Sequence, residues 1–123
     1  MSDAVDRAFN TVADGYARHR PRCPSELAER VASACASHRV CWEPGCGSGQ
    51  VTPLLAEHFE TVLATDPAEG AIAQCPTIEG VRFEVGTCEA CDLPAGSVDL
   101  VASGQAAHWF DMNAFAAEVR RVA

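Results

Sequence analysis

The 123-residue sequence has few basic residues and no long apolar run. Lysine and arginine together number 9, against 17 aspartates and glutamates, and the formal charge is −8. Nucleic-acid binding needs clustered basic residues to neutralise phosphates, so this balance argues against a nucleic-acid partner and favours a small-molecule substrate. No apolar stretch approaches the roughly 20 residues of a membrane span, and the polar start Met1–Ala4 does not have the form of a signal peptide. We therefore expect no membrane partner and a cytoplasmic location.

Seven cysteines are present, but a second cysteine pair with metal-ligand spacing is missing. Cys88 and Cys91 have two residues between them, as in many zinc sites, yet a zinc site needs two further ligands. The number of cysteines is odd, and several fall in predicted strands or helices, where cysteine behaves as a small buried hydrophobe. We expect reduced thiols and no metal, with a zinc site as the minor alternative.

A glycine-rich turn follows a predicted buried strand in the run Val40–Gln50. Glycine allows positive φ and close approach of a ligand, and a helix that begins after the turn offers N–H groups and a positive dipole end. A dinucleotide-binding sequence reads Gly-x-Gly-x-x-Gly, whereas here Gly45, Gly47 and Gly49 alternate and Gln50 follows. The turn therefore predicts a nucleotide-like ligand, and the spacing disfavours a dinucleotide.

Helical and strand patterns alternate along the chain. Apolar residues at three- and four-residue steps predict helices in five segments: 5–18, from 24 to about 35, 51–59, 67–75, and 112–122 after a capping Asp111. Short apolar runs predict strands at 39–43, 61–65, 81–85 and 98–103. This alternation predicts an α/β domain over residues 1–123, with N-terminal helices in 1–38 and a core in 39–123 whose parallel sheet has helices on both faces.

Seven short segments then suggest a family. They are Tyr16–Pro21, Glu43–Gln50, Thr65–Pro67, Gly86–Glu89, Leu93–Pro94, Ser97–Val101 and Ala107–Phe110. In this order and spacing they resemble the class I S-adenosylmethionine-dependent methyltransferases of the small-molecule type, near the trans-aconitate methyltransferase-like (type 11) enzymes. The resemblance implies a Rossmann-like three-layer α/β/α fold with strand order 3-2-1-4, and methyl transfer from S-adenosylmethionine to a small-molecule acceptor. It also implies that three further strands of a complete enzyme would follow Ala123.

The resemblance assigns the glycine turn and the end of the second strand to the cofactor. The residues that would surround its methionine and ribose part are Glu43, Gly45, Cys46, Gly47, Gly49, Asp66 and Pro67. Backbone N–H groups at a helix start can hold a carboxylate, and an acidic side chain at the end of the second strand can accept ribose hydroxyl protons. The alternative role for Asp66 is a cap of the next helix.

Residues after the third and fourth strands complete the implied site. Thr87 and Cys88 would lie near the adenine, although Thr87 stands where the family commonly has Asp, so that backbone contact through Cys88 is the alternative. Gln105 would lie beside the cofactor, and His108 is the candidate general base, with an ordinary pKa of about 6.5. A packed or solvent-facing His108 is the simpler interpretation. Tyr16 and Arg20 would contact the cofactor from a lid.

The fourth predicted strand would form an edge of the sheet. With the order 3-2-1-4, backbone N–H and C=O groups of 98–101 would lack partners, and such an edge favours pairing. We expect the edge to be covered by a missing half or by self-association. A non-catalytic cofactor-binding or assembly module is the second hypothesis for function. A nicotinamide-dependent oxidoreductase is the third, disfavoured by Gln50.

Overall fold

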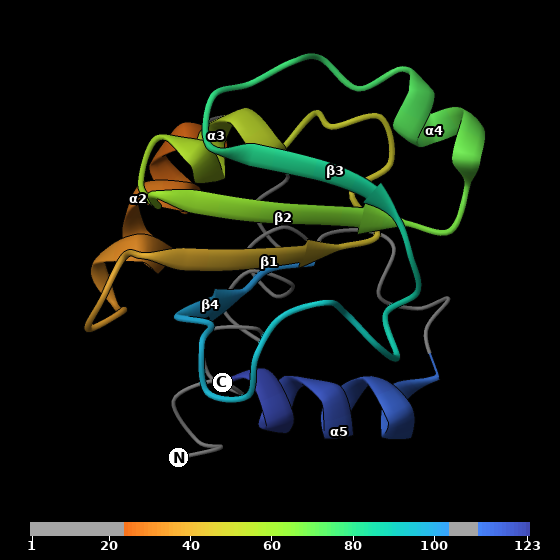
Figure 1. The fold of residues 1–123 in the computed structure, drawn as a ribbon. Coiled ribbons are helices and arrows are strands. Elements are labelled where there is room, and N and C mark those ends of the chain that lie inside the picture. Colours follow the sequence, from red (N-terminus) through yellow and green to blue (C-terminus); the bar gives the residue numbers. More distant parts are fainter. Residues whose placement is uncertain (1–23, 104–110) are drawn as a thin grey trace.

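A four-stranded parallel sheet lies at the centre of the structure, a computed structural model that describes residues 24–103 and 111–123 (Figure 1). The elements in chain order are α2 (Pro24–Ser33), β1 (Val40–Pro44), α3 (Thr52–Ala56), β2 (Thr61–Asp66), α4 (Glu69–Ala73), β3 (Val81–Val85), β4 (Leu100–Val101) and α5 (Met112–Val122). The strand order is β3-β2-β1-β4, which confirms the predicted 3-2-1-4 order and the Rossmann-like architecture.

The register of the strands brings their carboxyl ends to one edge of the sheet. Val40 of β1 pairs with Thr61 of β2 and Pro44 with Thr65, while Asp66 at the end of β2 pairs with Val85 of β3. Because all four strands are parallel, the segments that follow them emerge at the same edge. Open α/β sheets bind ligands at this edge, so the fold places the glycine turn where a ligand site is expected.

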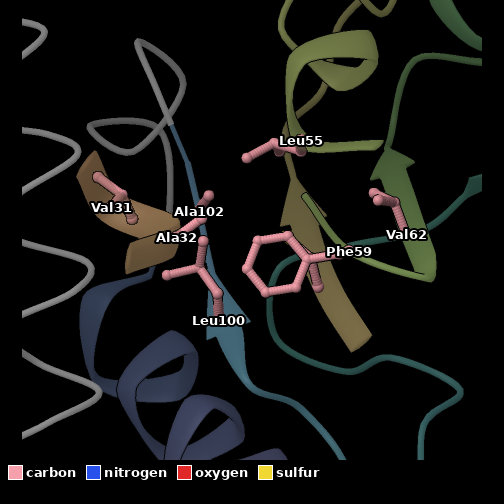
Figure 2. Packing of buried hydrophobic residues seen from close by; sticks show 8 residues of the cluster. Val31, Ala32, Leu55, Phe59, Val62, Leu100 and Ala102 are labelled. Atoms are coloured by element: carbon pink, nitrogen blue, oxygen red, sulfur yellow. The ribbon is translucent and has the colours of Figure 1, made fainter. Parts of the chain in front are cut away.

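Alternate strand residues pack into two separate cores. One core lies under α2 and α3, and seven of its side chains are labelled in Figure 2: Val31, Ala32, Leu55, Phe59, Val62, Leu100 and Ala102. The other lies under α5, on the opposite face of the sheet in Figure 1, and contains Trp42, Leu63, Cys88, Val98, Val101, Phe115, Val119 and Val122. Neighbouring strand residues such as Val62 and Leu63 enter different cores because side chains alternate across a strand.

The large Trp42 side chain fixes the second core at the centre of the sheet. It is fully buried, and its ring meets Phe115 of α5 edge-on, with centroids 6.1 Å apart. Its indole N–H donates to Thr65 Oγ1 over 3.1 Å, so the one polar atom of the ring has a partner inside the protein. The amphipathic pattern predicted for 112–122 is therefore confirmed as a helix that covers this face.

Several element boundaries differ from those predicted. The helix predicted over 51–59 is limited to Thr52–Ala56, although Phe59 still reaches the core because its N–H donates to Leu55 O over 3.1 Å. The strand predicted over 98–103 is limited to Leu100–Val101, because the N–H of Val98 donates to Val122 O of α5 rather than to the sheet. Docking of the preceding loop on α5 therefore delays the start of β4.

A charged contact holds that loop on α5. Glu118 is buried and accepts from the backbone N–H of Cys91 over 2.7 Å. Arg121 pairs with Glu118 at 2.7 Å and donates to Cys91 O over 3.1 Å. Hydrogen bonding from Arg121 lowers the pKa of Glu118.

None of the helices in 24–103 and 111–123 has the length and apolarity needed to cross a membrane.

Asp111 provides a test of the capping prediction. Its Oδ1 accepts from the N–H groups of Asn113 and Ala114 over 3.1 and 3.2 Å at the start of α5. We expect Asp111→Ala to lower the free energy of unfolding by about 1 kcal/mol, because two helix N–H groups lose their acceptor. Urea unfolding measures the loss. Asp111→Asn, which keeps an acceptor oxygen, should lie close to the wild type, and equal losses in the two variants would contradict the capping role.

Candidate cofactor-binding site

The glycine turn connects the end of β1 to α3 at the carboxyl edge of the sheet. Gly45, Gly47 and Gly49 have φ of 71°, 60° and 86°, a region that other residues adopt only with strain. The N–H of Cys46 donates to Thr65 O over 2.9 Å, and that of Gly49 donates to Cys46 O over 3.1 Å. The turn is thus folded on itself and joined to β2.

Two of these glycines have different surroundings. A Cβ on Gly47 would meet nothing within 4 Å, so this position faces open space. A Cβ on Gly49 would lie 3.1 Å from Phe83 Cε1 of β3, which is a crowded contact. Gly47 therefore leaves room for a ligand beside the backbone, whereas Gly49 allows the turn to pack on β3.

Asp66 joins the turn to the end of β2. Its Oδ2 accepts from the N–H of Gly47 over 3.0 Å, and its Oδ1 accepts from the N–H of Ala68 over 2.8 Å. The N-cap position of α4 is Ala68, without a side-chain cap, so Asp66 is not the capping residue considered as the alternative. The two bonds hold the carboxylate beside the glycine turn.

Glu43 is buried at the end of β1, with 4% of its surface exposed. Its Oε1 accepts from the Thr52 hydroxyl over 2.5 Å. Burial raises the pKa of Glu43 to about 8, and the bond from Thr52 acts in the opposite direction. The carboxyl is therefore mostly protonated at neutral pH, a property that its place in the sequence did not indicate.

The remaining predicted residues lie around this edge or outside the described part of the chain. The N–H of Gly86 donates to Asp66 O over 3.1 Å, which brings the segment after β3 next to the carboxylate. Thr87 is exposed there, while the Cys88 side chain is buried in the core under α5, so only its backbone is left for a ligand. Pro67 is exposed. The predicted residues that lie outside the described ranges are Tyr16, Arg20, Gln105 and His108.

Two contacts at the strand ends were not predicted. Ser103 is fully buried and its hydroxyl donates to Pro44 O over 3.0 Å, which ties the segment after β4 to the end of β1. Thr52, the partner of Glu43, is also fully buried. The sequence contained one signal for the contact between Thr52 and Glu43. Thr52 is the first residue of the helix after the turn, and that position faces the end of β1.

A surface hollow of about 390 Å³ lies at the other end of the strands, lined by His38, Arg39, Glu57, His58, Phe59 and Glu60. His38 is exposed, yet it has contacts with other residues. Its Nε2 lies 2.6 Å from Ala32 O, and its ring contacts Phe59 edge-on. His38 thus joins the end of α2 to the first core, which gives it a structural role.

A parallel sheet of this order, with a glycine turn after the first strand and a carboxylate after the second, is the arrangement of Rossmann-like folds, the class that includes many nucleotide-binding proteins. The sequence matches the family described as a methyltransferase domain over residues 42–123. The chain belongs to this methyltransferase family, and not to the oxidoreductases considered above. The predicted family is confirmed.

Individual relatives agree with this assignment. A Dictyostelium discoideum protein named as a methyltransferase is 36% identical over 118 residues, which are 95% of this chain and 45% of that protein. The solved structure of a type II methyltransferase from Anaeromyxobacter dehalogenans is 42% identical with a TM-score of 0.79, over 85% of this chain and 44% of that one. An S-adenosylmethionine-dependent methyltransferase from Mesorhizobium loti is 27% identical with a TM-score of 0.59, over 68% and 40%. The chain thus spans less than half the length of these relatives.

The raised pKa of Glu43 predicts a pH dependence of stability. The unfolded chain releases this proton near the ordinary value of 4.5, whereas the folded protein keeps it until about pH 8. Between these values the wild type should lose stability relative to Glu43→Gln as the pH rises, by up to about 1.4 kcal/mol per pH unit. Urea unfolding at several pH values measures this difference. Glu118→Gln is the matched control. Because the pKa of Glu118 is lowered, the difference in unfolding free energy between the wild type and this variant should be constant above pH 5. A pH-independent difference for Glu43→Gln would contradict the prediction.

The different surroundings of Gly47 and Gly49 predict that substitution by alanine lowers the free energy of unfolding by different amounts at the two positions. Gly47→Ala should lower the free energy of unfolding by about 1 kcal/mol, the cost of positive φ in an alanine. Gly49→Ala should cost more, since it adds the contact with Phe83 to the same backbone strain. Thermal and urea unfolding compare the variants. Relief of the Gly49→Ala loss by Phe83→Leu would support the steric reason, and equal losses at the two positions would contradict it.

Proposed function

We propose that this chain forms the S-adenosylmethionine-binding part of a methyltransferase that acts on a small-molecule acceptor. The observation that carries the proposal is the Asp66 carboxylate held beside Gly47, whose missing side chain leaves open space. Family membership supports the reaction class, and the Mesorhizobium loti relative supports the cofactor through its own S-adenosylmethionine dependence. The cytoplasmic location and the absence of a nucleic-acid partner rest on composition.

Asp66 is suited to the ribose hydroxyls of the proposed cofactor. A carboxylate has about four acceptor positions, and the two backbone N–H groups use one on each oxygen. The remaining positions can accept two hydroxyl protons without breaking either bond. The hydrogen bond from the Gly47 N–H would therefore position the Asp66 carboxylate as the acceptor for the ribose hydroxyls.

The glycine turn would mainly let the cofactor come close to the backbone, and it would supply few hydrogen-bond donors. The N–H groups of Cys46, Gly47 and Gly49 already donate to Thr65 O, Asp66 and Cys46 O. The helix that follows, α3, has five residues, so its dipole is small. The cofactor would lie against the turn because no side chain at Gly47 occupies that space.

The chemistry in such a site depends on alignment. When bound, S-adenosylmethionine supplies an electrophilic methyl group on sulfur. The chain would orient the cofactor at the carboxyl edge of the sheet and exclude water on its own side, both of which lower the barrier of a displacement reaction. The position of Gln105 beside the cofactor and the role of His108 as the general base stay predictions.

A non-catalytic cofactor-binding module is the second candidate. Such a module would bind S-adenosylmethionine without transferring its methyl group. Single-turnover assays with labelled cofactor and a panel of acceptors distinguish it from an enzyme.

Calorimetric titration with S-adenosylhomocysteine tests the proposal. The wild type should bind, and Asp66→Asn should bind at least about tenfold more weakly, because hydrogen bonds to a charged acceptor contribute about 1.5–3 kcal/mol. Asp92→Asn, an exposed aspartate in the loop before β4, is the matched control. Circular dichroism confirms that each variant is folded. A folded wild type that gives no heat with S-adenosylhomocysteine, or that binds NADH instead, would overturn the proposal.

A further inference from the structure

Two cysteine thiols meet at the glycine turn. Cys46 belongs to the turn itself, and Cys75 follows α4. Each Sγ lies 3.5 Å from Gly47 O, and the Cys75 Sγ also lies 3.4 Å from Ala71 O. Residues that are 29 positions apart in sequence thus share one backbone acceptor beside the proposed cofactor site.

The two thiols differ in access to solvent. Cys46 is buried, with 6% of its surface exposed, whereas Cys75 is half-buried. A small oxidant would therefore reach Cys75 first. Burial raises the pKa of both thiols, and the Asp66 carboxylate raises it further, so neither is a stable thiolate at neutral pH. This pair is distinguished by its geometry and not by a low pKa. When one thiol has been oxidised, the other, held at the same backbone oxygen, can attack it at a high effective concentration.

We propose that Cys46 and Cys75 form a redox-sensitive thiol pair that a hydroperoxide converts into a disulfide, and that this disulfide weakens cofactor binding. The first half of the proposal stands on the Gly47 carbonyl oxygen that both thiols contact. The second half rests on the proposed function. Nothing in the methyl-transfer chemistry above uses either sulfur.

The reaction balances with one hydroperoxide. The Cys75 sulfur attacks the terminal oxygen, the O–O bond breaks, and a sulfenic acid forms with release of water or an alcohol. The Cys46 sulfur then attacks the Cys75 sulfur, an S–S bond forms and the S–OH bond breaks. The hydroxide leaves as water with the Cys46 proton. Two thiols are oxidised by two electrons, and the peroxide is reduced.

The disulfide would change the turn that presents Gly47. An S–S bond is about 2.05 Å long, so the two sulfurs, each 3.5 Å from Gly47 O, must move to bonding distance of each other. Because Cys46 is part of the turn, its backbone moves with its sulfur, and Gly47 O loses its contacts with the two thiols. Gly47 also donates to Asp66 over 3.0 Å, so the movement reaches the carboxylate proposed to bind ribose.

The other described cysteines have different surroundings. Cys41 is completely buried in the core under α2 and α3, and Cys88 is buried under α5. Cys35 donates its thiol proton to Val31 O. Cys91 is half-buried in the loop held by Glu118. Cys91 is therefore a suitable control position, exposed to a similar degree but away from the turn.

The test uses the reduced chain treated with one equivalent of hydrogen peroxide and then alkylated. Cleavage after Glu57 and Glu69 separates the two cysteines, so mass spectrometry identifies a linked Cys46–Cys75 peptide. Calorimetry with S-adenosylhomocysteine before and after oxidation should show a loss of affinity of about tenfold, the scale of losing one or two hydrogen bonds. Dithiothreitol should restore the affinity.

Matched variants separate the outcomes. Cys75→Ser keeps a donor near Gly47 O and should bind like the reduced wild type, with no change on peroxide treatment, whereas Cys91→Ser should respond like the wild type. Absence of the Cys46–Cys75 link, or a link between other cysteines, overturns the thiol pair. A correct link with unchanged affinity overturns its effect on the cofactor. If the reduced protein does not bind S-adenosylhomocysteine, the proposed function fails, while peptide mapping still decides the thiol pair.

Discussion

The hydrogen bond from the Gly47 N–H to Asp66 Oδ2, 3.0 Å long, is the constraint on which the site depends. It joins the turn after β1 to the end of β2, two segments that the parallel register brings to one edge of the sheet. Without a side chain, Gly47 allows both the positive φ and the approach of another group. The position of the carboxylate and the shape of the turn are thus fixed together.

The sheet and its covering helices could be predicted because the signals are local and repeated. Alternation along 61–65, 81–85 and neighbouring runs identifies strands, and the spacing of Phe115, Val119 and Val122 identifies a helix face, whatever else surrounds them. The strand order came from resemblance to a family, since no local pattern distinguishes 3-2-1-4 from other orders. Helix ends were less predictable. Phe59 satisfies a helical pattern, yet it reaches the core from the turn after α3.

The candidate site could be proposed from residue types, whereas its contacts could not be predicted. The glycine turn and Asp66 carry recognisable sequence signals, whereas Thr52, Ser103 and Cys75 find their partners only when distant segments meet. Such partners depend on tertiary packing, which a pattern of neighbouring residues does not contain. The raised pKa of Glu43 could not be predicted for the same reason, because it follows from burial in the folded protein.

Glu43 connects the proposed cofactor to the stability of the fold. Its buried carboxyl has a pKa of about 8, so ionising it costs folding free energy as the pH rises. A cation beside a carboxyl favours the ionised form and lowers its pKa. S-adenosylmethionine is a sulfonium cation that also carries an ammonium group, and a ligand that binds only the folded state stabilises it. If either cation approaches Glu43, binding of the proposed cofactor offsets the cost of ionisation, so the folded state gains most from this ligand in alkaline solution.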